Sequence, residues 1–103
     1  MPVVIVTAPE LASDAASAAL RAVNSAASSA LQLPAAAVHS MLVPSVAACT
    51  GTSVTTPWPT AVLHGRAREA DAMMRAVEAV AAALSSHWRR PVDEVWVQWA
   101  TNG

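Results

Sequence analysis

Apolar and polar residues follow strand-like patterns in four short segments of the chain. Residues 3–7 and 60–64 are apolar runs rich in β-branched side chains, which predicts a strand in each. Residues 37–43 form a third apolar run. In the fourth, residues 92–100, Val95, Val97 and Trp99 alternate with Glu94, Trp96 and Gln98. Strict alternation gives a strand two distinct faces, so this last segment is expected to bury one of them.

Two longer segments between these runs carry apolar residues at helical spacing. In the first, the positions at three- and four-residue steps are Leu20, Val23, Ala27 and Leu31. In the second they are Met73, Met74, Val77, Val80, Ala81 and Leu84, with Arg75 and Glu78 at polar positions between them. Pro34 and Pro91 follow the two segments and are expected to end the helices, because proline lacks the N–H that a helix needs.

This order of segments occurs twice. A shift of 57 residues places Pro2 on Pro59, Asp14 on Asp71, Val23 on Val80, Ser28-Ser29 on Ser85-Ser86, Pro34 on Pro91 and Val38 on Val95. The sequence therefore predicts one domain, residues 1–103, made of two tandem β-α-β repeats at about 2–46 and 59–101. A loop at about 44–58 would join them.

The two units predict an α/β (α+β) fold. A strand, a helix of about twenty residues and a further strand form a parallel pair with a right-handed crossover. Two such units give a four-stranded sheet with both helices on one face. The other face, carrying Trp96 or Trp99, would be bare in a monomer, so we expect it to be buried between subunits.

The connector between the repeats contains Gly51, several threonines and serines, and no charged residue. This composition predicts turns rather than helix or strand. Two interpretations are equally open for it: a plain linker, or a loop that lines a pocket.

Charge and cysteine content exclude several classes of function. The net charge is −1, and the six basic residues, all arginine, are scattered, so no nucleic-acid-binding face is expected. The single Cys49 excludes an internal disulfide, and no Cys/His spacing fits a metal site. No secretory signal or membrane span is found, which leads us to expect a cytoplasmic protein without membrane contact.

Three segments together resemble the tautomerase superfamily. They are the opening Met1–Val6, the His64–Arg68 turn, and Pro91–Trp99, which is similar to the closing strand of dehalogenase-like members. The superfamily includes macrophage migration inhibitory factor, oxalocrotonate tautomerase and cis-3-chloroacrylic acid dehalogenase. The resemblance implies β-α-β units, a proline exposed by methionine removal as catalytic base, no cofactor, and a homotrimer with sites at subunit boundaries.

The resemblance assigns a role to Pro2 and two arginines. After removal of Met1, Pro2 would carry a secondary amine that acts as general base when burial or positive charge disfavours its cation. Arg66 and Arg68 would hold the carboxylate of a small 2-oxo acid during keto–enol proton transfer. The alternatives are that Pro2 only begins an edge strand and that the arginines form a solvated helix start.

The resemblance also suggests three further substrate-binding residues. His39 falls where the oxalocrotonate-tautomerase branch has a substrate-binding arginine, although a surface strand histidine is the alternative. Trp96 and Gln98 match positions at which the inhibitory-factor branch places an aromatic hydroxyl and an amide near a neighbour's proline. Packing between subunits is the alternative for both.

The sequence departs from the family pattern in ways that bear on the reaction. It has no tyrosine or lysine to give electrophilic assistance. It ends at Gly103, without the extension whose acidic residue activates water in the dehalogenases, which favours tautomerisation. The alternatives are a related decarboxylase, hydratase or dehalogenase acting on small unsaturated acids, and a non-catalytic trimeric binding or structural protein. Retention of Met1 would favour the latter, because Pro2 would then be an amide.

Overall fold

A computed structural model describes residues 1–102 of the chain. The elements in chain order are β1 (Val3–Ala8), α1 (Ser13–Leu31), β2 (His39–Pro44), β3 (Ala48–Thr50), β4 (Ser53–Thr55), β5 (Thr60–Gly65), α2 (Ala70–Trp88) and β6 (Trp96–Thr101).

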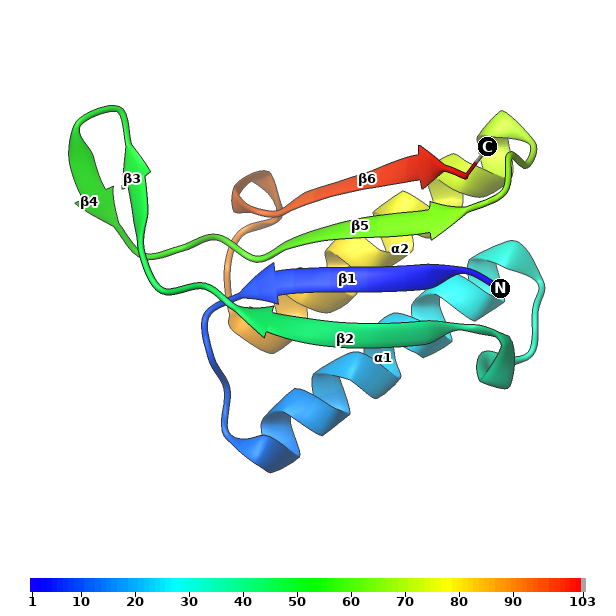
Figure 1. Cartoon of the computed structure of the whole chain (residues 1–103), viewed down its shortest axis with the longest axis horizontal. Coiled ribbons are helices and arrows are strands. Elements are labelled where there is room, and N and C mark those ends of the chain that lie inside the picture. Colours follow the sequence, from blue (N-terminus) through cyan, green and yellow to red (C-terminus); the bar gives the residue numbers. More distant parts are fainter. Residues whose placement is uncertain (103) are drawn as a thin grey trace.

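Four of the strands form one mixed sheet in the order β2-β1-β5-β6. The pairs β1/β2 and β5/β6 are parallel, whereas β1 and β5 run antiparallel at the centre. Both helices lie side by side behind this sheet (Figure 1). The predicted four-stranded sheet with two helices on one face is thereby confirmed.

Every element of the first unit recurs 57 residues later in the second. Strand β1 at Val3–Ala8 is matched by β5 at Thr60–Gly65, and α1 at Ser13–Leu31 by α2 at Ala70–Trp88. The helix ends also match: Gln32 and Arg89 adopt left-handed φ values of 56° and 54°. In the residue after each of these, Leu33 or Arg90, the backbone N–H donates to the carbonyl of Ser28 or Ser85 in the last helical turn. This pattern is a Schellman-type helix end.

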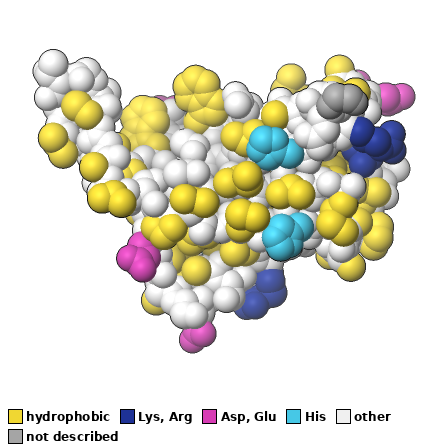
Figure 2. Space-filling model, viewed as in Figure 1, with side chains coloured by type: hydrophobic (Ala, Val, Ile, Leu, Met, Phe, Trp, Pro, Cys, Tyr) yellow, Lys and Arg dark blue, Asp and Glu magenta, His cyan; other side chains and the backbone are white. Residues whose placement is uncertain are grey.

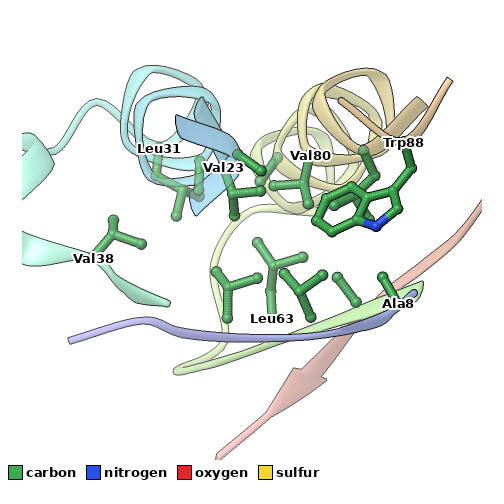
Figure 3. Close-up of a cluster of buried hydrophobic side chains, with 14 residues drawn as sticks. Ala8, Val23, Leu31, Val38, Leu63, Val80 and Trp88 are labelled. Carbon is green, nitrogen blue, oxygen red and sulfur yellow. The ribbon is translucent and has the colours of Figure 1, made fainter. Parts of the chain in front are cut away.

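The hydrophobic core lies between the sheet and the helices (Figure 3). The sheet contributes alternate residues, and each helix contributes residues at four-residue steps: Ala19, Val23, Ala27 and Leu31 from α1, and Ala76, Val80, Leu84 and Trp88 from α2. Trp88 also donates its indole N–H to the Pro9 carbonyl at 2.8 Å. The prediction that Met74 belongs to the apolar face was wrong, because its side chain is 58% exposed.

The predicted starts of the last strand in each unit were too early. Residues Ala35–Ala37 and Val92–Glu94 form single turns of 3₁₀ helix, so β2 and β6 begin only at His39 and Trp96. In each turn the carbonyl of the preceding proline accepts a hydrogen bond from the backbone N–H of the residue three positions later, at 2.9 Å. A closed turn after proline therefore replaces the extended backbone that the apolar run suggested.

The connector between the units was predicted to lack strands, and this was wrong. Strands β3 and β4 form an antiparallel hairpin that projects from one end of the molecule (Figure 1). Gly51, with φ of 61°, opens its two-residue turn, a conformation that glycine adopts without steric cost. Strands of only three residues show no readable alternation, which is why the pattern failed to reveal them.

The face of the sheet opposite the helices is largely apolar and uncovered (Figure 2). Strand register places on it the residues His39, Met41, Val43, Val3, Ile5, Thr7, Thr60, Val62, His64, Trp96, Gln98 and Ala100. None of these residues is Asp, Glu or Arg. We call this surface the open face. Within residues 1–102, neither helix has the length and apolarity needed to cross a bilayer.

Candidate functional site

Pro2 lies directly before β1, at the end of the sheet where β5 and β6 finish (Figure 1). Its ring is buried, whereas the preceding Met1 is 80% exposed. The Pro2 carbonyl accepts a hydrogen bond from the His39 N–H at 3.1 Å, which joins the starts of β1 and β2. Because Val3 pairs with His64 in antiparallel register, Pro2 lies opposite Gly65.

Gly65 packs beneath the indole of Trp99, on the same end of the sheet. A Cβ at Gly65 would come within 2.9 Å of Trp99 Cζ2, which is shorter than a normal carbon contact. The close approach is therefore available to glycine alone without a shift of the ring. The Gly65 carbonyl also accepts from the Asn102 N–H at 2.7 Å, so the strand end next to Pro2 is held from two sides.

Arg66 and Arg68 follow Gly65 in the loop that leads into α2. The helix itself begins at Ala70, so both arginines lie directly before its first turn. Arg66 is exposed and Arg68 is half-buried. Glu69 occupies the N-cap position, and its side chain makes no capping hydrogen bond.

The two arginines line a cleft of about 380 Å³ between the end of α1 and the start of α2. We call it the arginine cleft. Its lining residues are Ala30, Leu31, Gln32, Arg66, Arg68, Glu69, Ala72 and Arg75. Among the described residues the ion pair present is between Arg90 and Glu94, so none of Arg66, Arg68 and Arg75 forms an ion pair with a carboxylate.

His39 is the first residue of β2 and points to the open face. It pairs with Val3, which on its other side pairs with His64, so the two histidines flank the residue after Pro2. His39 is exposed and His64 half-buried. The structure thus brings Pro2, His39 and Arg66 to one end of the sheet.

Trp96 and Gln98 do not join Pro2 within one chain. Trp96 pairs with Thr60 at the opposite end of β5 from His64, about 13 Å away at the usual rise of a strand. Gln98 pairs with Val62 in the middle of the sheet. Trp96 is 65% exposed on the open face, so it can reach the site of Pro2 only from another copy of the chain.

A larger cavity of about 520 Å³ lies at the far end, between the hairpin and the sheet. Threonines, small residues, Pro57 and Trp58 line it, and Cys49 is its one residue with a titratable side chain. Within residues 1–102 no group of three or more His, Cys, Asp or Glu side chains is placed to hold a metal ion. Apart from Cys49, the titratable side chains that line either cavity belong to the arginine cleft.

Arg75 and Gln32 are cleft residues that the sequence pattern did not indicate. Arg75 was interpreted only as a polar position of α2, and Gln32 follows the last turn of α1. A helical wheel places Arg75 on the side of α2 that carries Ala72, one turn earlier. Which part of α1 lies against that side depends on how the two helices pack. The long-range contact between α1 and α2 could not be read from spacing.

No protein-family model and no curated protein sequence matches the chain. Solved structures do match it. A fused 4-OT forming an asymmetric trimer aligns with a TM-score of 0.90 and 15% identity, over 97% of this chain and 85% of that one. Pt0534 inactivated by 2-oxo-3-pentynoate aligns with a TM-score of 0.88 and 19% identity, over 97% and 85%. Macrophage migration inhibitory factor of Toxoplasma gondii aligns with a TM-score of 0.76 and 17% identity, over 98% and 90%.

These alignments cover nearly the whole chain, and 4-OT is a tautomerase. The chain therefore has the fold of the tautomerase superfamily, as the resemblance implied. At identities below one fifth, the likeness establishes the architecture and leaves the activity to be argued from the site.

Proposed function

We propose that the chain is a cofactor-independent tautomerase that moves a proton within a small 2-oxo acid, with Pro2 as general base. The observation that carries this proposal is the meeting of Pro2 and the Gly65–Arg66 turn at one end of the sheet. The fold shared with a tautomerase supports it. So does Pt0534, since its inactivator 2-oxo-3-pentynoate is itself a 2-oxo acid.

The proposed step needs Met1 to be removed, so that Pro2 carries a free secondary amine. The Pro2 nitrogen would take a proton from carbon 3 of the 2-oxo acid while the C–H electron pair forms the carbon–carbon double bond. The carbonyl oxygen would then receive the proton, which gives the enol, and ketonisation would run in reverse. Arg66 and Arg68 would hold the substrate carboxylate through paired hydrogen bonds, and their positive charge would disfavour protonated Pro2.

We further propose that the site is completed in a homotrimer. Burial of the open face between copies would remove exposed apolar side chains such as Met41, Val43 and Trp96 from water. It would also allow Trp96 and Gln98 of one copy to approach Pro2 of another, and His39 to face the bound acid. The trimeric fused 4-OT proteins offer a precedent for assembly of this fold.

The test is ketonisation of phenylenolpyruvate, followed in the full chain, Pro2→Ala, Arg66→Ala and the control Arg21→Ala. Arg21 is exposed on α1, outside the cleft, and its loss changes the net charge equally. We expect Pro2→Ala to lower turnover by about 100-fold or more, and Arg66→Ala to raise KM mainly. Equal rates in all four proteins would refute both assignments, and release of halide or CO₂ from substituted substrates would favour the dehalogenase or decarboxylase alternative.

A non-catalytic role is the second candidate, because retention of Met1 would make the Pro2 nitrogen an amide. An amide nitrogen does not accept protons at physiological pH. This candidate predicts that intact-mass analysis finds Met1 on every molecule and that Pro2→Ala leaves the properties of the protein unchanged.

A further inference from the structure

Two of the three histidines of the chain lie on the open face. His39 begins β2 and His64 lies near the end of β5, and both pair with Val3 of the strand between them. At the usual spacing of strands, their Cα atoms are about 10 Å apart. Figure 2 shows histidine side chains among hydrophobic ones on this face. The third histidine, His87, lies in the last turn of α2, in the helix layer.

No acidic side chain on the open face can balance a charge on these two imidazoles. The other open-face residues come from all four strands of the sheet, and none of them is charged. Among the described residues, the charged groups next along the chain at this end are Arg66, after β5, and the amino terminus, before β1, and both are cations. Within residues 1–102, neither His39 nor His64 forms an ion pair with a carboxylate.

Burial of the open face between copies would remove both imidazoles from water. A charged imidazolium requires water or a counter-charge, and its transfer to an apolar contact that offers neither is unfavourable. A neutral imidazole carries a much smaller penalty. Each copy contributes two of these histidines, so the three copies of a trimer contribute six. Assembly through this face therefore favours the neutral form of the pair.

The direction of the pH effect follows from proton binding. Histidine side chains gain a positive charge as the pH falls from about 8 to about 5. In separate copies the two imidazoles are in contact with water and take up these protons, whereas in the assembly they stay neutral. Lower pH therefore stabilises the separate copies relative to the assembly. Carboxylates ordinarily titrate near pH 4, below this window, so they contribute little to the change.

We infer that His39 and His64 make the assembly of this chain pH-dependent. Further copies of the chain cover the open face at about pH 8, and protonation of the two histidines separates the copies at about pH 5.5. The inference rests on the proposed homotrimer. Because the two histidines flank the residue after Pro2, separation would also withdraw a neighbour's side chains from the Pro2 end of the sheet.

The experiment is analytical ultracentrifugation of the full chain over a range of protein concentrations, at about pH 8 and about pH 5.5 and at equal ionic strength. Wild type should be a trimer at the higher pH, and the concentration for half-assembly should rise at least about tenfold at the lower pH. Far-UV circular dichroism should be the same at both, since the copies separate without unfolding. Equal half-assembly concentrations, or unfolding at the lower pH, would overturn the inference and leave the homotrimer standing.

Variants locate the effect. In the double variant His39→Gln/His64→Gln the side chains stay polar but gain no proton, so its assembly should not change between the two pH values. Each single variant should keep part of the wild-type shift, which supplies the same test if the double variant does not fold. The matched control His87→Gln removes a histidine from the helix layer and should keep the whole shift. A folded double or single variant with the full wild-type shift would overturn the assignment.

The outcome is separable from the proposed proton transfer. A wild-type monomer at about pH 8 would overturn the homotrimer and this inference with it. A pH-dependent trimer that does not ketonise phenylenolpyruvate would support the inference and remove the tautomerase.

Discussion

The contact between Gly65 and Trp99 makes a sharp prediction for a single added methyl group. In Gly65→Ala the new Cβ would lie 2.9 Å from Cζ2 and 3.3 Å from Cη2 of the indole. Favourable carbon contacts begin at about 3.5 Å, so the ring or the strand must give way by about half an ångström or more. The indole is rigid and packs against the core, so its retreat disturbs neighbouring side chains.

Overpacking of this kind costs about 1–3 kcal/mol of the free energy of unfolding. For a domain of this size, each kcal/mol corresponds to a fall in Tm of about 4–8 °C. We therefore expect Gly65→Ala to unfold at least about 4 °C lower than wild type, measured at equal protein concentration. The φ of Gly65 is not left-handed, so backbone strain adds nothing.

A double-mutant cycle isolates the contact. Trp99→Leu removes the ring that the methyl group strikes, so Gly65→Ala should cost little or nothing in the W99L background. The matched control is Gly51→Ala, at a glycine with open space around it but φ of +61°. Its cost of about 1 kcal/mol comes from the backbone and should be the same with either residue at position 99.

Denaturation in urea supplies the four free energies of the cycle. A coupling energy near zero between Gly65→Ala and Trp99→Leu would show that the indole does not restrict this position. The packing of the strand end beside Pro2 would then need another explanation. A stable Gly65→Ala protein with wild-type Tm would refute the reasoning directly.

Three further predictions concern the core and the open face. Leu84→Ala, at a fully buried position, should lower the free energy of unfolding in urea by about 2–5 kcal/mol; a loss below 1 kcal/mol would contradict that burial. Trp88→Phe should lower the free energy of unfolding by about 1–3 kcal/mol, because it leaves the Pro9 carbonyl without its donor. An unchanged urea midpoint would show that the 2.8 Å hydrogen bond contributes nothing to stability. If the open face joins copies, Met41→Glu should sediment as a monomer while the exposed helix variant Ser17→Glu keeps the wild-type mass, and identical masses would place the interface elsewhere.

The sequence predicted the architecture well because the signal was repeated. Two weak β-α-β patterns offset by 57 residues supported one another, and proline residues marked the end of each helix. The alternation in residues 95–99 also assigned Trp96 and Trp99 to opposite faces, and the structure places them so. Core positions in α2 were less clear, because alanine-rich helices offer little contrast between apolar faces.

The features that the sequence did not predict depend on contacts between residues far apart in the sequence, or on very short elements. The β3-β4 hairpin has strands of three residues, too few for a pattern. Membership of Arg75 and Gln32 in the arginine cleft follows from the packing of the end of α1 against the start of α2. No spacing rule relates those two segments, so only the tertiary structure shows that they share a cleft.

The central claim is that the free amine of Pro2 carries the reaction. It is tested by comparing phenylenolpyruvate ketonisation in two preparations of known intact mass, one with Met1 removed and one with an alanine inserted before Pro2. The account predicts rapid turnover in the first and a rate at least about 100-fold lower in the second, where Pro2 is an amide. Equal turnover in the two preparations would contradict it.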